Sequence, residues 1–129
     1  MSDLIARCEK CEKNPNYVFI SIHQNTFPSS KYSGLQVFYS RNNAGSRALA
    51  GILRKNNKQM IDSNNTREEK MSGREIYILD YLSGPSVLVE CGFLSNAEEA
   101  ERLNTAKYQK QLAFMIYSSV MQYIFSENT

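Results

Sequence analysis

The chain has 129 residues, of which 42% are hydrophobic and 22% charged, the composition of one ordinary globular domain. Its formal net charge is only +2, and its lysines and arginines form no basic stripe interleaved with aromatic residues, which argues against a nucleic-acid binder. No apolar run reaches the length of a membrane span, and the first ten residues lack the pattern of a secretory signal. We therefore expect a single domain, with no nucleic-acid partner and no transmembrane segment.

The first half of the chain alternates between helix-like and strand-like hydrophobic periods. Residues 2–14 predict a short helix that ends before Pro15. Residues 17–23 predict a strand with apolar side chains on both faces, which is typical of a strand that is covered on both sides. A second strand is expected over residues 35–40 and a helix over residues 44–57, followed by a long polar connection.

The second half shows the same alternation. The apolar segments 75–82 and 86–93 predict two strands separated by a Ser-Gly-Pro break. Ser95 and Glu98 stand at capping-box spacing and predict the start of a helix. A final core-packing helix is expected from side chains at steps of three and four, which are Tyr108, Leu112, Met115, Ile116, Ser119 and Tyr123. The whole pattern predicts an α/β fold.

Two ionisable side chains stand at the ends of apolar strands. The only histidine, His23, ends the first predicted strand, and Glu90 directly follows Val87, Leu88 and Val89. Open α/β sheets bind ligands beside the carboxyl ends of their strands, and a buried carboxylate there gains a pKa suited to general acid or base catalysis. Each residue could instead be an ordinary strand end that faces solvent or bonds a nearby backbone group. Position alone leaves both readings open.

The three cysteines are an odd number in a chain too long for a disulfide scaffold, so reduced thiols are expected. Cys8 and Cys11 form a CxxC, a pattern that binds zinc or exchanges disulfides in other settings. Here no second CxxC follows and the pair lies within a helical pattern, which favours structural thiols. Cys91 should point to the opposite face of its strand from Glu90, as a small core residue. The alternative is a thiol hydrolase that uses Cys91 and His23.

Several segments resemble one enzyme family. "VFISIHQN", "SGLQVFYS", "NNTREEK" and "PSVLVECGFLSNAEEAERLNTAKYQKQLAFMIYSSV" are similar, in register over residues 4–124, to the second part of the zinc-dependent N-acetylmuramoyl-L-alanine amidases. The wording "SIHQNTFPSSKYSGLQVFY" most resembles the germination-specific branch, which acts on spore cortex. The resemblance implies an open, mixed, largely parallel sheet flanked by helices. It also implies hydrolysis, outside the cytoplasmic membrane, of the amide between muramic acid and L-alanine in peptidoglycan.

The same resemblance assigns roles to residues. His23 matches a zinc ligand, and Glu90 matches the glutamate that takes a proton from the zinc-bound water and passes it to the leaving nitrogen. Asn25 and Arg67 fall in family-like blocks and are candidates for substrate binding, although a structural role for each is an equal alternative. The implied cofactor is a single zinc ion.

One part of the family pattern has no counterpart in this chain. Family members begin with a "GHGG"-type turn and a later glutamate, which supply the other zinc ligands. The resemblance therefore implies that residues 1–129 are an N-terminally truncated catalytic domain with an incomplete zinc site. Such a chain should be inactive alone, and the free edge of the strand over residues 17–23 should favour self-association. A catalytically inactive peptidoglycan-binding module is the alternative function.

Overall fold

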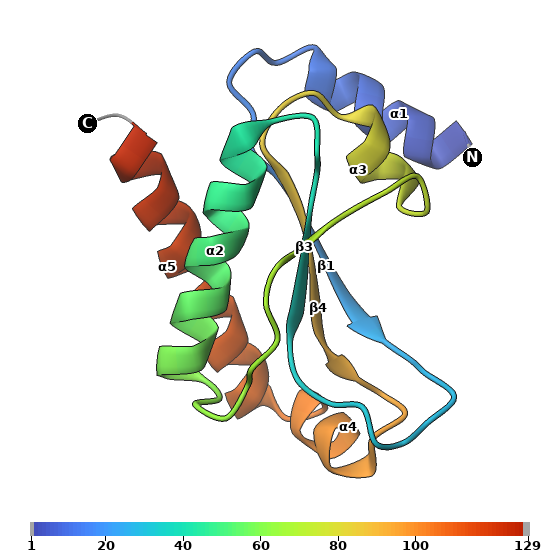
Figure 1. The fold of residues 1–129 in the computed structure, drawn as a ribbon, viewed down its shortest axis with the longest axis vertical. Helices are drawn as coiled ribbons and strands as arrows, with labels where there is room; N and C mark the ends of the chain where they lie inside the picture. The colour runs from blue at the N-terminus through green and yellow to red at the C-terminus, as the bar shows by residue number, and fades with distance from the viewer. Residues whose placement is uncertain (1, 128–129) are drawn as a thin grey trace.

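The computed structural model describes residues 2–127 and confirms the predicted α/β class (Figure 1). The helices are α1 (Ser2–Glu12), α2 (Ala44–Met60), α3 (Tyr77–Tyr81), α4 (Ala97–Leu103) and α5 (Ala106–Glu127). The strands are β1 (Phe19–Asn25), β2 (Gln36–Tyr39), β3 (Lys70–Met71) and β4 (Ser86–Phe93). In this part of the chain no helix is both long and apolar enough to cross a bilayer.

The strands form one open sheet in the order β1-β4-β2-β3. β4 pairs in parallel with β1 and antiparallel with β2, and β2 pairs in parallel with β3, so the sheet is mixed with more parallel than antiparallel pairs. β4 is buried along almost its whole length, because it has a partner on each side and helices on both faces. β1 is an edge strand whose outer side has no partner among the described residues.

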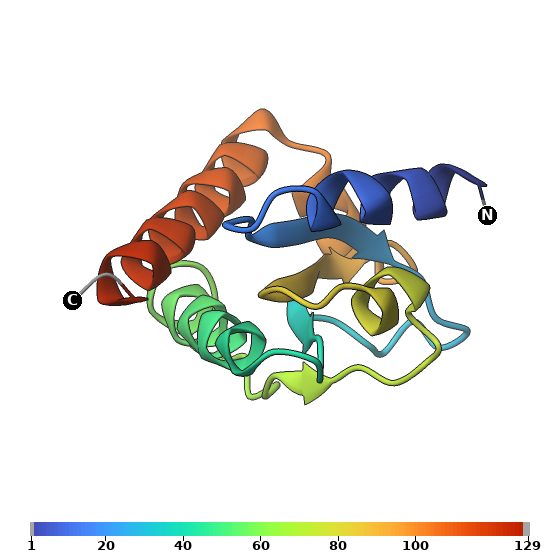
Figure 2. The same cartoon turned by 90° about the horizontal axis from the view of Figure 1, so that it is seen from above.

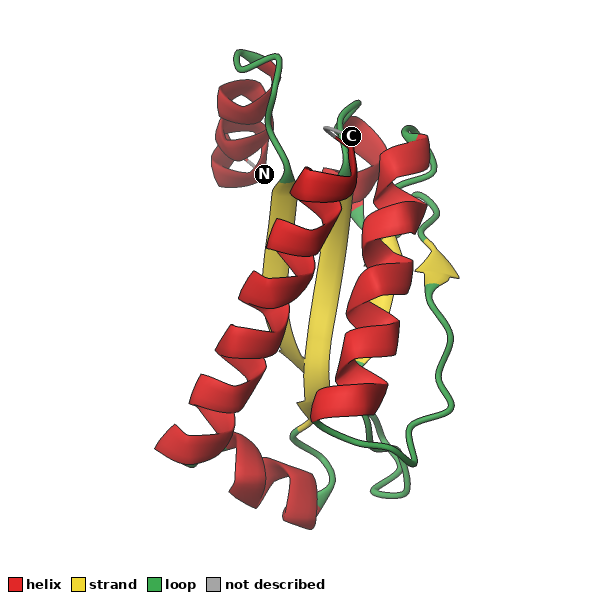
Figure 3. Cartoon of the chain, turned by 90° about the vertical axis from the view of Figure 1, so that its left-hand side faces the viewer, coloured by secondary structure: helices red, strands yellow, loops and turns green. Residues whose placement is uncertain are grey.

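Helices α2 and α5 cover one face of the sheet, as Figure 3 shows. Their apolar sides pack on the alternate side chains of the strands, and the fully buried members of this cluster include Leu49, Leu53, Val87, Val89 and Met115. The expected α5 stripe is confirmed, since Leu112, Met115, Ile116, Ser119 and Tyr123 are buried. This layer is the main core.

Helices α1 and α3 cover only part of the opposite face, where they pack on Leu88 of β4. Cys8 is completely buried in this second cluster beside Leu79 and Leu82, so this thiol is a core residue. The end of the face toward the carboxyl ends of β1 and β4 is left uncovered by helices (Figures 1 and 2). That uncovered region is where the candidate active site lies.

Two local predictions were wrong. The expected strand over residues 75–82 is helix α3, which places Ile78 and Leu79 against α1. A short apolar run fits a strand or a helix equally well by pattern, and here packing against α1 selects the helix. The predicted helix start is displaced by one residue, because the N-cap of α4 is Asn96 and not Ser95; the Asn96 side chain accepts a hydrogen bond from the Glu99 N–H at 3.1 Å.

Candidate active site

The structure brings His23 and Glu90 together. They are directly opposite residues on the adjacent parallel strands β1 and β4, so their side chains share one face of the sheet. Gln36 of β2 is the partner of Glu90 on the other side. The three polar side chains therefore form a row across β1, β4 and β2, on the face that α1 and α3 leave partly uncovered. We call His23, Glu90 and Gln36 the polar row.

Glu90 is the half-buried centre of the polar row. Its Oε2 atom is buried and has no hydrogen-bond partner among the described residues. Burial raises the pKa of Glu90 above its ordinary value, and the nearby charge of His23 partly offsets this rise. A buried carboxylate oxygen without a partner is costly for stability, and such groups are concentrated at functional sites. The environment of Glu90 suits a residue that exchanges a proton with a bound molecule.

Gln36 is the member of the polar row that sequence reasoning missed. It is buried, and its Nε2 donates to the backbone oxygen of Glu68 at 2.7 Å, which ties the α2–β3 connection to the sheet. A glutamine inside the apolar segment "LQVFY" was the available signal. Its place beside Glu90 depends on the antiparallel register of β2, which the sequence pattern does not specify.

Asn25 and Arg67 lie near the carboxyl end of the sheet, and each has contacts within the protein. The Asn25 side chain accepts a hydrogen bond from the N–H of Thr26 at 2.8 Å. Arg67 donates from Nε to the Ser33 oxygen at 2.9 Å, and its guanidinium lies over the Phe93 ring, 5.0 Å from the centroid. These contacts give both residues a supporting role, and substrate binding by either one stays a prediction.

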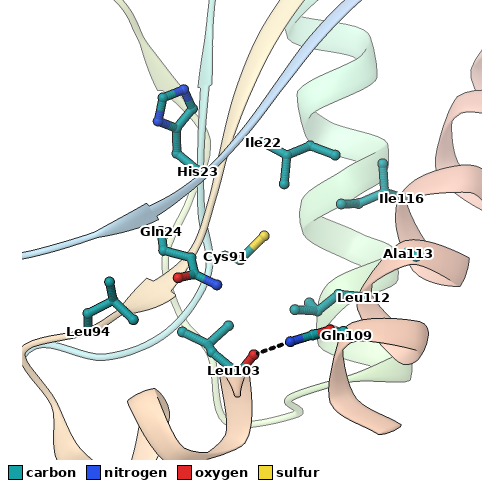
Figure 4. Close-up of a pocket in the computed structure, with 10 residues that line it drawn as sticks. All are labelled: Ile22, His23, Gln24, Cys91, Leu94, Leu103, Gln109, Leu112, Ala113 and Ile116. Carbon is teal, nitrogen blue, oxygen red and sulfur yellow. Dashed lines mark hydrogen bonds between the residues drawn. The ribbon is translucent and has the colours of Figure 1, made fainter. Parts of the chain in front are cut away.

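Cys91 lies on the other face of β4, away from the polar row. Figure 4 shows its sulfur directed into a groove between β1 and α5, while the imidazole of His23 points away from that groove. The thiol is buried, and desolvation raises its pKa to about 11, so very little thiolate exists at neutral pH. This geometry argues against a Cys91–His23 nucleophile pair.

The metal site that the resemblance implies is incomplete in this chain. Residues 2–127 contain no group of three or more His, Cys, Asp or Glu side chains placed to hold one metal ion. Cys8 and Cys11 are free thiols whose pKa values burial raises, and they are not joined by a third ligand. Since catalytic zinc needs three protein ligands, the residues present do not fit a complete zinc site.

Glu99 is a second buried carboxylate that the sequence did not single out. Its side chain accepts hydrogen bonds from the N–H of Gly34, 2.9 Å from each carboxylate oxygen, and from the N–H of Phe93 at 2.6 Å. Gly34 has φ 97°, a conformation that glycine adopts without strain. A Cβ at Gly92 would lie 2.7 Å from the Glu99 carboxyl group, so the glycine leaves room for it. Glu99 thus fastens the β1–β2 loop to the end of β4.

Replacing Glu99, and with it the hydrogen bonds to Gly34 and Phe93, should destabilise the fold. We expect Glu99→Gln to lower the free energy of unfolding by about 1.5–3 kcal/mol, because an amide nitrogen cannot accept the N–H bonds and the charge is lost. Urea unfolding followed by circular dichroism measures the change. Glu98→Gln, on the exposed side of α4, is the matched control and should leave stability unchanged. Equal stability of the two variants would contradict a stabilising role for the Glu99 hydrogen bonds.

Comparison with known proteins agrees with this fold. A family model described as N-acetylmuramoyl-L-alanine amidase matches residues 2–122. The match covers nearly the whole chain, so its fold is that of an amidase class of protein. The chain belongs to the N-acetylmuramoyl-L-alanine amidase family.

Individual relatives show the same kinship. The germination-specific N-acetylmuramoyl-L-alanine amidase of Bacillus subtilis is 32% identical over 121 residues, which are 94% of this chain and 50% of that protein. The CwlD amidase of Clostridioides difficile, solved in complex with the GerS lipoprotein, superposes with a TM-score of 0.90 at 37% identity, over 96% of this chain and 62% of that one. The amidase AmiC2 of Nostoc punctiforme gives a TM-score of 0.81 at 31% identity, over 93% of this chain and 64% of that one. The chain therefore spans about half to two thirds of the length of these relatives.

Proposed function

We propose that this chain is the part of a peptidoglycan amidase that carries the catalytic glutamate, within the single domain expected for residues 1–129. The reaction is hydrolysis of the amide between N-acetylmuramic acid and L-alanine, in spore cortex maturation or germination, outside the cytoplasmic membrane. The observation that carries the proposal is the buried, unpartnered Oε2 of Glu90 opposite His23 in register. The likeness to the germination-specific relative supports the spore role.

In this proposal each polar residue of the site has one task. Glu90 takes a proton from the attacking water and passes it to the nitrogen of the leaving L-alanine, which its raised pKa favours. His23 would hold a zinc ion as one ligand, and residues 2–127 place no group of three ligands around it. Asn25 and Arg67, at the carboxyl end of the sheet, contact the substrate. Gln36 ties the α2–β3 connection to the sheet beside Glu90.

The test is a chimera with a relative of which this chain covers 50%. Residues 4–124 of this chain replace the matching region of the Bacillus subtilis germination-specific amidase, and the chimera is incubated with spore peptidoglycan. We expect new amino-terminal L-alanine groups and peptide-free glycan as products. A chimera that is folded and binds zinc but only binds peptidoglycan, with no cleavage and no effect of Glu90→Ala, would support an inactive binding module instead.

The free edge of β1 bears on the predicted self-association of the chain. β1 is an edge strand, and Ile22 is 60% exposed above an open groove of about 570 Å³ between β1 and α5. Phe114 and Tyr117 of α5 are also exposed apolar residues. Unpaired apolar edges readily bind a further strand. We propose that the isolated chain self-associates through β1.

Ile22→Lys should therefore convert an associating chain into a monomer, because a lysine at the edge opposes strand pairing. Light scattering across a concentration series measures the molar mass. The matched control is Met71→Lys, since Met71 is 59% exposed on β3 at the opposite edge of the same sheet. Association that persists in the Ile22 variant, or that only the Met71 variant removes, would place the contact elsewhere.

A further inference from the structure

The loop between β1 and β2, residues 26–34, borders the candidate active site. It leaves the sheet at the carboxyl end of β1 and extends away from α2 and α5, on the same side as α1 and α3 (Figures 1 and 2). The polar row lies on that side of the sheet, with α1 and α3 at one end and the loop at the other. Phe27 is four residues beyond His23, which is at most about 13 Å of extended chain.

Hydrogen bonds fix this loop at several points. Glu99 holds Gly34 at its far end. The Phe27 N–H donates to Ser95 Oγ at 3.1 Å near its start. In its middle the Asn96 side chain donates to the Ser30 oxygen, 3.0 Å away. The loop is thus preorganised, and a ligand that binds to it does not have to order it first.

Two aromatic side chains of the loop form a surface that the described part of the chain leaves half open. The rings of Phe27 and Tyr32 meet edge to face with centroids 4.5 Å apart, and they are 48% and 44% exposed. The buried Phe93 supports Tyr32 from below, at 6.2 Å between centroids. We call Phe27 and Tyr32 the aromatic pair. Large exposed rings in fixed positions beside a reaction site are typical of ligand contacts.

We propose that the aromatic pair is a glycan subsite, on which a pyranose ring of the peptidoglycan strand stacks beside the scissile amide. The C–H face of a sugar ring is apolar and packs on aromatic rings, while the Tyr32 hydroxyl can bond a sugar hydroxyl at the ring edge. The stem peptide carries carboxylates, but Lys31 is the only charged residue of the loop. The uncharged glycan is therefore the better match. This inference rests on the proposed function and names the part of the substrate that this surface binds.

The test measures binding by the whole chain of chitotetraose, a β-1,4-linked oligosaccharide with no peptide, using NMR titration. We expect the double variant Phe27→Ala, Tyr32→Ala to weaken binding about tenfold or more, the range of a lost binding hot spot. Tyr32→Phe, which keeps the ring, should retain most of the affinity, and the NMR spectrum of the double variant shows directly whether that variant is folded. Tyr117→Ala and Phe125→Ala are matched controls, since these α5 aromatics are 62% and 64% exposed and far from the loop in sequence.

Unchanged chitotetraose affinity in the double variant, or no binding by the wild-type chain, would overturn the glycan subsite. Binding of the free stem peptide that depends on the aromatic pair, without glycan binding, would also overturn it, in favour of a peptide subsite. Neither result bears on amide cleavage by the chimera, so failure of this inference and failure of the proposed function give different data. If the chimera cleaves the amide but the double variant binds chitotetraose as tightly as the wild-type chain, only the glycan subsite is overturned.

Discussion

In the chimera, Glu90→Gln is expected to lower the rate of amide cleavage by about 10²- to 10⁴-fold, the usual contribution of a positioned general base. Glutamine keeps the shape of the side chain, but its amide cannot take a proton from the attacking water. The rate is measured as the release of amino-terminal L-alanine groups from spore peptidoglycan. Zinc content is measured on the same samples, because Glu90 is proposed to act on the proton and not to bind the metal.

The matched control is Glu101→Gln, which removes a carboxylate from the exposed surface of α4 and should leave the rate unchanged. A loss of rate with a full zinc content in the Glu90 variant separates a catalytic role from a structural one. A Glu90→Gln chimera that keeps more than about a tenth of the wild-type rate would exclude Glu90 as the general base.

The regions predicted correctly are those where one physical signal dominates. β4 is apolar on both of its faces because it is the central strand under two helical layers, and that is visible in "SVLVECGF". The long α5 shows a stripe of period 3.6, and its inward side chains are buried as expected. Such patterns depend only on which side chains are buried, and the order of apolar and polar residues along the chain shows this directly.

The regions predicted wrongly, or not at all, depend on contacts between distant segments. α3 contains isoleucine and tyrosine residues that favour strands, yet its packing on α1 makes it a helix. Glu99 looked like an ordinary residue of an amphipathic helix, but its partners Gly34 and Phe93 come from other parts of the chain. No local pattern contains that information.

The residues of the candidate site likewise include some that the sequence predicted and some that it did not. The sequence placed His23 and Glu90 at strand ends, whereas β1 continues to Asn25 and β4 to Phe93. The parallel register of β1 and β4 makes the two residues direct neighbours. Gln36 and the aromatic pair were not predicted, because their positions depend on the antiparallel register of β2 and on how the loop folds back.

The purified chain, dialysed after exposure to zinc, is expected to retain well below one zinc ion per molecule and to release no muropeptide. His23 is the only histidine of the sequence, and residues 2–127 hold no group of three ligands, whereas catalytic zinc sites use three. Elemental analysis by mass spectrometry measures the metal, and His23→Ala should change the small residual content little in the isolated chain. The same substitution in the chimera should remove a zinc ion that the unmodified chimera retains, because there His23 completes a ligand set. One zinc per isolated chain, lost in His23→Ala, would instead mean that association of copies brings ligands together, and zinc retention should then fall in Ile22→Lys as well.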